Sequence, residues 1–133
     1  MSQENATLAW RAAHAWGEGG AAAILPFLDP EIEWHPPQGR SELGGYLGDA
    51  GVCEYLGRFD ETVRRAVIAP VRVHDLDDDR VISLLRVNAR DEASAEEIEA
   101  ELGWLINVRG AKFVKVRTFT SHERVFEAAG LRG

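Results

Sequence analysis

The stretch that decides the fold lies in the last third of the chain, where residues 98–120 read IEAELGWLINVRGAKFVKVRTFT. Every second residue from 98 to 108 is apolar, and such alternation predicts a strand with one buried face. Gly110 and Ala111 separate it from a second alternating run at residues 113–120. A glycine at the first central position favours a two-residue type II′ hairpin between the two strands.

Further strand patterns extend the sheet upstream of this hairpin. Runs rich in apolar and β-branched residues predict strands at about residues 66–76, 80–90 and 96–108, with polar turns between them. A shorter strand at residues 31–35 stops at Pro36-Pro37, because proline has no N–H to donate to a ladder. Together with the hairpin, these runs predict a sheet of several strands.

Helical patterns flank the strands. Apolar residues at helical spacing predict a first helix from Ser2 to the glycines at 17–20, and a third over residues 52–59. The second, at 21–28, is limited to about two turns by its proline. Ser121 is placed to cap a last short helix. Strands flanked by helices predict an α+β fold, and the length of residues 1–133 fits a single domain.

Composition narrows the classes of partner. The formal net charge of -7 argues against nucleic acid or an anionic membrane as the main partner. The first residues show no basic segment followed by an apolar core, and no apolar run reaches the roughly 18 residues of a membrane span. Cys53 is the only cysteine, so no disulfide forms within the chain. We therefore expect a cytoplasmic protein.

Metal and cofactor motifs are absent from the sequence. Asp75, Asp77 and Asp79 begin like a calcium loop, but Arg80 and Arg86 stand where the loop needs glycine and glutamate. The four histidines are scattered and lack the spacing of a zinc site. No glycine-rich phosphate loop follows a strand. We expect neither a metal ion nor a cofactor.

The order of these elements resembles the SnoaL-like branch of the NTF2-like superfamily. The resemblance rests on the segment 28–34, the Arg-Gly-Ala-Lys turn at 109–112 and the terminal residues 127–131. It implies an NTF2-like cone, in which a curved antiparallel sheet wraps around N-terminal helices and a short helix ends the chain. It also implies an apolar pocket at the mouth of the cone and a homodimer through the outer face of the sheet.

The family's known chemistry transfers poorly to this chain. The tyrosine and the aspartate of ketosteroid isomerases fall at Ala12 and Trp34, which can neither donate to an oxyanion nor take a proton from carbon. The acidic residue of SnoaL-type cyclases falls at Ser121. For the Asp-Arg-Asp trio of epoxide-hydrolase-like members, only Arg86 and Glu101 are available.

Aromatic and polar side chains suggest a ligand pocket inside the cone. Strand parity points Trp34 and Trp104 inward, and a wall of aromatic rings suits a ring-shaped ligand, although plain core packing is the commoner role of any single aromatic residue. The predicted ligand-binding residues are Trp10, Trp34, Tyr55, Phe59, Arg86, Trp104 and Ser121. Glu101 and His14 are the candidate catalytic groups.

Each polar candidate has a structural alternative. Glu97, Glu99 and Glu101 could form a solvated strand face or pair with Lys115 and Arg117 across the hairpin. Arg86 could equally contact a dimer partner, and His14 could be an exposed or satisfied histidine. The adjacent Ser121, His122 and Glu123 look like a hydrolytic trio, but neighbours at a helix start rarely reach the required geometry.

Two functional hypotheses follow from the sequence. In the first, the chain is a pocket protein for a small, largely apolar, ring-type molecule, with or without catalysis of the cyclase, isomerase or hydratase kind. In the second, it is a non-catalytic module for dimerisation or partner binding, and its own aromatic residues fill the cone. The two differ in one feature, since contact between Trp34 and Trp104 without a void favours the second.

Overall fold

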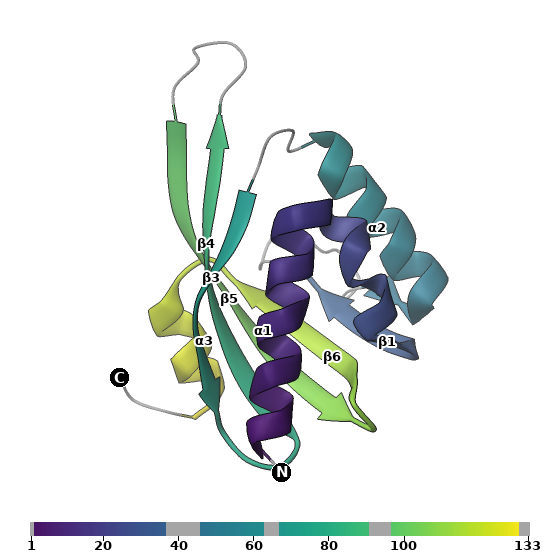
Figure 1. Ribbon diagram of the computed structural model, residues 1–133, viewed down its shortest axis with the longest axis vertical. Coiled ribbons are helices and arrows are strands. Elements are labelled where there is room, and N and C mark those ends of the chain that lie inside the picture. Colours follow the sequence, from purple (N-terminus) through teal and green to yellow (C-terminus); the bar gives the residue numbers. More distant parts are fainter. Residues whose placement is uncertain (1, 37–45, 63–66, 91–96, 131–133) are drawn as a thin grey trace.

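The computed structural model describes residues 2–36, 46–62, 67–90 and 97–130 of the 133-residue chain. The helices in this part are α1 (Ser2–Gly19), the 3-10 helix η1 (Ala21–Phe27), α2 (Gly48–Thr62) and α3 (His122–Ala128). The strands are β1 (Leu28–His35), β2 (Tyr46–Leu47), β3 (Val67–Asp75), β4 (Arg80–Arg90), β5 (Glu97–Arg109) and β6 (Lys112–Phe119). Helices α1 and α2 lie over one face of the sheet, and α3 lies on the other (Figure 1).

The sheet is mixed, with strand order β2-β1-β6-β5-β4-β3. The α+β NTF2-like fold expected from the sequence is confirmed. The expectation of an antiparallel sheet is wrong at one place, because β1 runs parallel to β6, with Trp34 opposite Val116. A parallel pair needs a long crossover. Here α2 and four strands intervene between β1 and β6. The short β2 was not among the strands expected from the sequence.

The hairpin between β5 and β6 has a two-residue turn, since Arg109 pairs directly with Lys112. Gly110 has φ 60° and Ala111 has φ 62°. Two positive φ angles define a type I′ turn, so the expected type II′ turn is wrong. The type I′ twist matches that of long paired strands, and here it forces an alanine into the left-handed region.

At two glycines, which have no Cβ atom, a helix lies very close to the sheet, one helix on each face. A Cβ atom on Gly17 would lie 2.6 Å from the carbonyl oxygen of Ile68, so α1 rests directly on the backbone of β3. A Cβ atom on Gly103 would lie 2.9 Å from Cγ1 of Val125, so α3 rests directly on β5. Substitution at either glycine must displace a helix or the sheet beneath it.

The outer strand β3 is interrupted by a bulge. Pro70 pairs with Leu85 and Arg72 pairs with Leu84, so Val71 between them is an extra residue without an opposite partner. Its side chain is 47% exposed. Proline and bulges are typical of edge strands, because they break the row of free backbone donors.

The turn after β3 is held by an exposed carboxylate. Asp77 accepts the backbone N–H of Asp79 at 3.0 Å and the Nε of Arg80 at 2.9 Å. These hydrogen bonds, with the charge of Arg80, hold the pKa of the Asp77 carboxyl below its usual value. Asn5 of α1 donates to the carbonyl of Asp78 at 2.8 Å, which ties the turn to the first helix.

Replacing Ala111 by glycine is expected to stabilise the protein. A left-handed backbone costs an L-residue roughly 1–2 kcal/mol. The greater freedom of glycine in the unfolded chain offsets about 0.4–1 kcal/mol of that gain. Denaturant unfolding of Ala111→Gly should therefore show a gain of about 0.5–1 kcal/mol. Gly110→Ala is the matched control and should lose stability. A type II′ turn, with negative φ at residue 111, would instead make Ala111→Gly destabilising.

Candidate functional site

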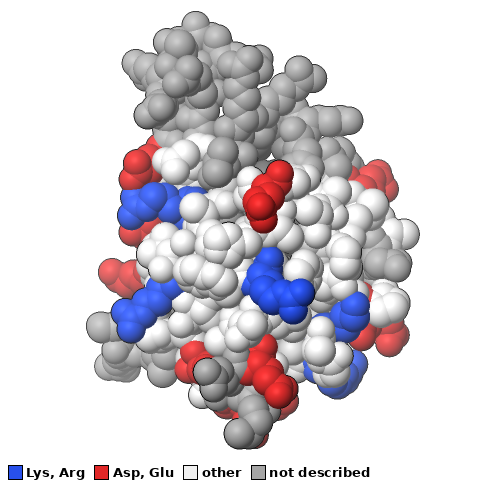
Figure 2. All heavy atoms as spheres, in the orientation of Figure 1, with Lys and Arg blue, Asp and Glu red and all other residues white. Residues whose placement is uncertain are grey.

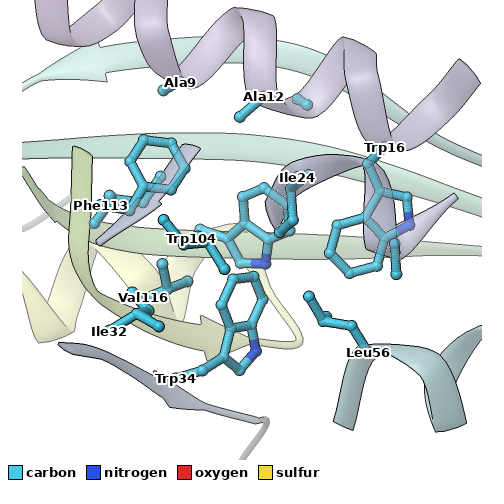
Figure 3. Packing of buried hydrophobic residues seen from close by; sticks show 14 of the residues in the cluster. Ala9, Ala12, Trp16, Ile24, Ile32, Trp34, Leu56, Trp104, Phe113 and Val116 are labelled. Carbon is cyan, nitrogen blue, oxygen red and sulfur yellow. The ribbon is translucent and has the colours of Figure 1, made fainter. Parts of the chain in front are cut away.

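Three tryptophans fill the interior of the cone. Trp16 comes from α1, Trp34 from β1 and Trp104 from β5, and their rings converge (Figure 3). The ring centroid of Trp104 lies 5.3 Å from that of Trp16 and 5.6 Å from that of Trp34. Trp16 and Trp34 lie 6.3 Å apart. The three side chains are 5%, 2% and 1% exposed in chain order, so solvent scarcely reaches them.

The surroundings of this indole cluster (Trp16, Trp34 and Trp104) are apolar. Aliphatic side chains from η1, α2 and the sheet complete the packing, and Ile24 and Leu56 are fully buried beside the rings (Figure 3). Among the described residues, the only buried polar or charged ones are Ser83 and Thr118. No carboxylate or histidine of the described chain is buried in this interior.

The two buried hydroxyls flank the central indole. Ser83 of β4 and Thr118 of β6 both pair with Trp104 of β5, so the three side chains form one row across the concave face. Neither hydroxyl oxygen has a hydrogen-bond partner in the described structure. A buried hydroxyl without a partner costs roughly 1–3 kcal/mol. The row therefore places two hydroxyl groups without hydrogen-bond partners beside an otherwise apolar cluster.

The other aromatic candidates lie outside the cluster. Trp10 is 39% exposed on α1, and its ring makes an edge contact with His14 at 5.4 Å. Both are exposed residues of α1. The face of the molecule in Figure 2 shows basic and acidic side chains scattered among uncharged residues. Tyr55 of α2 stacks on Tyr46 of β2 at 4.6 Å. Phe59 belongs to α2, but its side chain lies outside the described residues.

Arg86 and Glu101 lie on the convex face of the sheet, opposite the indole cluster. They pair across β4 and β5 one position away from the inward residues Leu85 and Leu102. Arg86 forms an ion pair with Glu99. The structure thus separates both residues from Trp34 and Trp104, with which the sequence grouped them.

Glu99 and Glu101 of β5 do not pair with the basic residues of β6; both are exposed, which fits the alternative of a solvated strand face. Pairing fails because β6 ends at Phe119, opposite Gly103, so in the described residues the stretch of β5 before Gly103 has only β4 beside it. Lys115 instead lies 3.8 Å from a carboxylate oxygen of Glu33.

The polar residues at the start of α3 hold that helix on the sheet. The Ser121 hydroxyl accepts the N–H of Arg124 at 3.1 Å, as a helix N-cap does. The Glu101 carboxylate accepts the N–H of His122 at 2.9 Å. The His122 ring Nε2 lies 2.9 Å from the carbonyl of Leu85, and its Nδ1 lies 3.8 Å from Glu101. These contacts hold α3 on the sheet. Ser121 and His122 each bond to other groups and not to one another.

A hollow of about 320 Å³ lies between the end of β6 and α3. Its walls are formed by Thr118, Phe119, Thr120, Arg124 and Glu127. None of these was a predicted site residue. One sequence signal could have suggested it. Pro36 ends the strand that pairs with β6, so the last residues of β6 lose a neighbour.

The described residues contain neither a metal-binding cluster nor a membrane-spanning helix. No group of three or more histidine, cysteine, aspartate or glutamate side chains there could hold a metal ion. In the same residues, no helix has both the length and the apolar character needed to cross a membrane.

Removing the caps of α3 tests whether Ser121 and Glu101 are structural. Ser121→Ala should cost about 0.5–2 kcal/mol of unfolding free energy, because the Arg124 N–H loses its acceptor. Glu101→Gln should cost less, since an amide oxygen still accepts the N–H of His122. Urea unfolding measures both. An unchanged midpoint in Ser121→Ala would contradict the capping role.

Solved structures share this fold at low sequence identity. Bal32a from a soil-derived mobile gene cassette has a TM-score of 0.73 at 21% identity, covering 88% of each chain. A candidate polyketide cyclase from Xanthomonas campestris pv. campestris has a TM-score of 0.72 at 19% identity, covering 95% of this chain and 96% of that one. TerC, co-crystallised with polyporic acid, has a TM-score of 0.73 at 20% identity, covering 93% and 96%.

Comparisons at the level of sequence give one result. No curated protein matches the chain. The model of the SnoaL-like domain family matches residues 9–116, which include α1 from Ala9 onwards, η1, α2 and all strands up to the middle of β6. The chain therefore belongs to the SnoaL-like domain family.

Proposed function

We propose that this SnoaL-like chain is a non-catalytic binding module whose cone interior is a structural core. The observation that carries the proposal is the mutual packing of Trp16, Trp34 and Trp104, each at most 5% exposed. A ligand entering between these rings would have to displace at least one of them. Losing the packing of one buried tryptophan costs roughly 3–5 kcal/mol, about half of a micromolar binding free energy.

The chemistry of the interior supports the same conclusion. Isomerisation or cyclisation of a ring compound needs a base, and a donor that stabilises the developing oxyanion. In the described interior, the buried polar side-chain groups are the hydroxyls of Ser83 and Thr118 and the indole N–H groups of the three tryptophans, and an indole N–H cannot act as a base. A hydroxyl is a weak base, and it becomes a nucleophile only beside a histidine or another base. The candidate groups Glu101 and His14 lie on the convex face and on the outside of α1.

The names of two structural relatives favour a second candidate function, the binding of a ring-type ligand. One is called a candidate polyketide cyclase, and the other was crystallised with polyporic acid. Both share only the fold with this chain at their level of identity. In this chain the three indoles occupy the interior, and the experiment below separates the two functions.

A cavity-forming variant with added indole tests the proposal. Trp104→Ala should lose roughly 3–5 kcal/mol and leave a void that indole can fill, so millimolar indole should raise its melting temperature. Indole should leave the melting temperature of the wild type unchanged. Trp10→Ala removes an exposed indole without making a void, so indole should not affect it.

If Trp104→Ala does not fold, Trp104→Leu leaves a smaller void and serves the same purpose. A rise in the melting temperature of the wild type with indole or naphthalene would mean that the native cone accepts ring ligands. That result would overturn the structural-core proposal in favour of the pocket.

The partner of the module is proposed to be a second copy of the chain, docked through the convex face of the sheet. On that face α3 covers only part of β4 and β5, and the exposed pair Arg86–Glu99 lies beyond it. A two-fold contact brings the same patch of both copies together. Opposite charges spread over such a patch can pair across the two-fold axis.

Sedimentation analysis of charge-reversed and apolar variants tests this partner. The wild type should sediment as a dimer, and Arg86→Glu should shift it towards monomer by placing like charges in the contact. Arg11→Glu, on the outside of α1, is the matched control and should leave the dimer intact. A monomeric wild type would contradict the proposal. So would a dimer that dissociates in Trp10→Ala and persists in Arg86→Glu, because α1 would then form the contact.

A further inference from the structure

We infer that the hollow between β6 and α3 is a binding site for a small aromatic acid that also carries a hydroxyl group. Its walls are the end of β6, with Thr118, Phe119 and Thr120, and the outer side of α3, with Arg124 and Glu127. The inference deepens the proposed binding function, because it assigns a ligand class to a surface outside the closed cone. It uses none of the residues of the indole cluster.

The hollow exists because one neighbour of β6 stops early. The pairing of β1 with β6 ends at His35 and Arg117, and Pro36 then follows without an N–H group. On its other side, β6 stays paired with β5 as far as Phe119. Among the described residues, the last ones of β6 thus have a strand on one side only, and α3 begins just beyond them.

The charges of the hollow favour an anion that can also donate a hydrogen bond. Within the described chain, no ion pair engages the guanidinium of Arg124 or the carboxylate of Glu127, although they are one turn apart on α3. A guanidinium binds a carboxylate through two parallel hydrogen bonds. A carboxylate accepts only, so Glu127 selects a ligand hydroxyl over a second anionic group. Carboxylate and hydroxyl on one ligand match these two side chains.

The size and lining of the hollow fit one aromatic ring. Its volume of about 320 Å³ lies at the small end of known ligand pockets. Phe119 supplies an apolar surface, and the guanidinium carbon of Arg117 lies 5.4 Å from its ring centroid, which adds positive charge nearby. A ligand ring can therefore contact Phe119 while its carboxylate approaches a region with two arginines.

Thr118 contributes to this wall without offering its hydroxyl to a ligand. Its side chain is buried in the concave row beside Trp104, on the face of the sheet opposite α3, so the polar groups of the site are those of Arg124 and Glu127.

Binding of 4-hydroxybenzoate to the full chain tests the site. Titration followed by NMR should give saturable binding in the range of about 0.1–10 mM, with the largest shifts at residues 118–127. Arg124→Gln should weaken binding at least tenfold. Glu127→Gln should reduce the preference for 4-hydroxybenzoate over benzoate. Arg11→Gln, on α1, is the matched control and should bind as the wild type does.

Three results would overturn the site. The first is that no binding of 4-hydroxybenzoate is seen at about 10 mM. The second is that Arg124→Gln and the wild type bind it with equal affinity. The third is that the chemical-shift changes centre on the three buried indoles. The first two leave the proposed function standing, since that depends on the response of the wild type and Trp104→Ala to indole. The third would overturn both proposals together, because it would place the ligand inside the cone.

Discussion

The packing of Trp16, Trp34 and Trp104 is the contact on which the rest of the structure depends. It joins α1 to β1 and β5, which are distant in the sequence, and it sets the distance between the helices and the concave face. Three large rings at the centre need a curved sheet to surround them. They also leave little space for anything else, so one contact fixes both the shape of the cone and its lack of an interior acid or base among the described residues.

The short helix α3 explains why polar residues interrupt strands that otherwise read as apolar. Glu101 and His122 meet at its first turn, and Gly103 lets Val125 approach the backbone of β5. The convex face therefore has its own small core under α3, made by Ile82, Leu84, Leu105 and Val125. Polar residues in an otherwise apolar strand therefore have two explanations, a ligand pocket or a face that is shared between a helix and solvent.

Strand parity and helical spacing predicted most of the fold. The expected strand at residues 80–90 matches β4, and parity placed Trp34 and Trp104 in the interior as observed. The direction of β1 against β6 could not be predicted, because it depends on how the chain crosses the helical layer. The choice between turn types at Gly110-Ala111 was also open, since twist of the paired strands decides it. Parity alone does not tell what a polar residue such as Arg86 contacts, because that depends on where α3 lies on the sheet.

The two outer strands of the sheet are unlike the long strands between them. At one edge β2 has only two residues, and at the other Val71 bulges out beside Pro70. An edge with free backbone donors can add strands from other chains without limit, whereas a shortened or bulged edge cannot. The sheet thus has a built-in end on both sides. Within the described residues, both edges of the sheet therefore oppose the open-ended addition of strands that builds fibres.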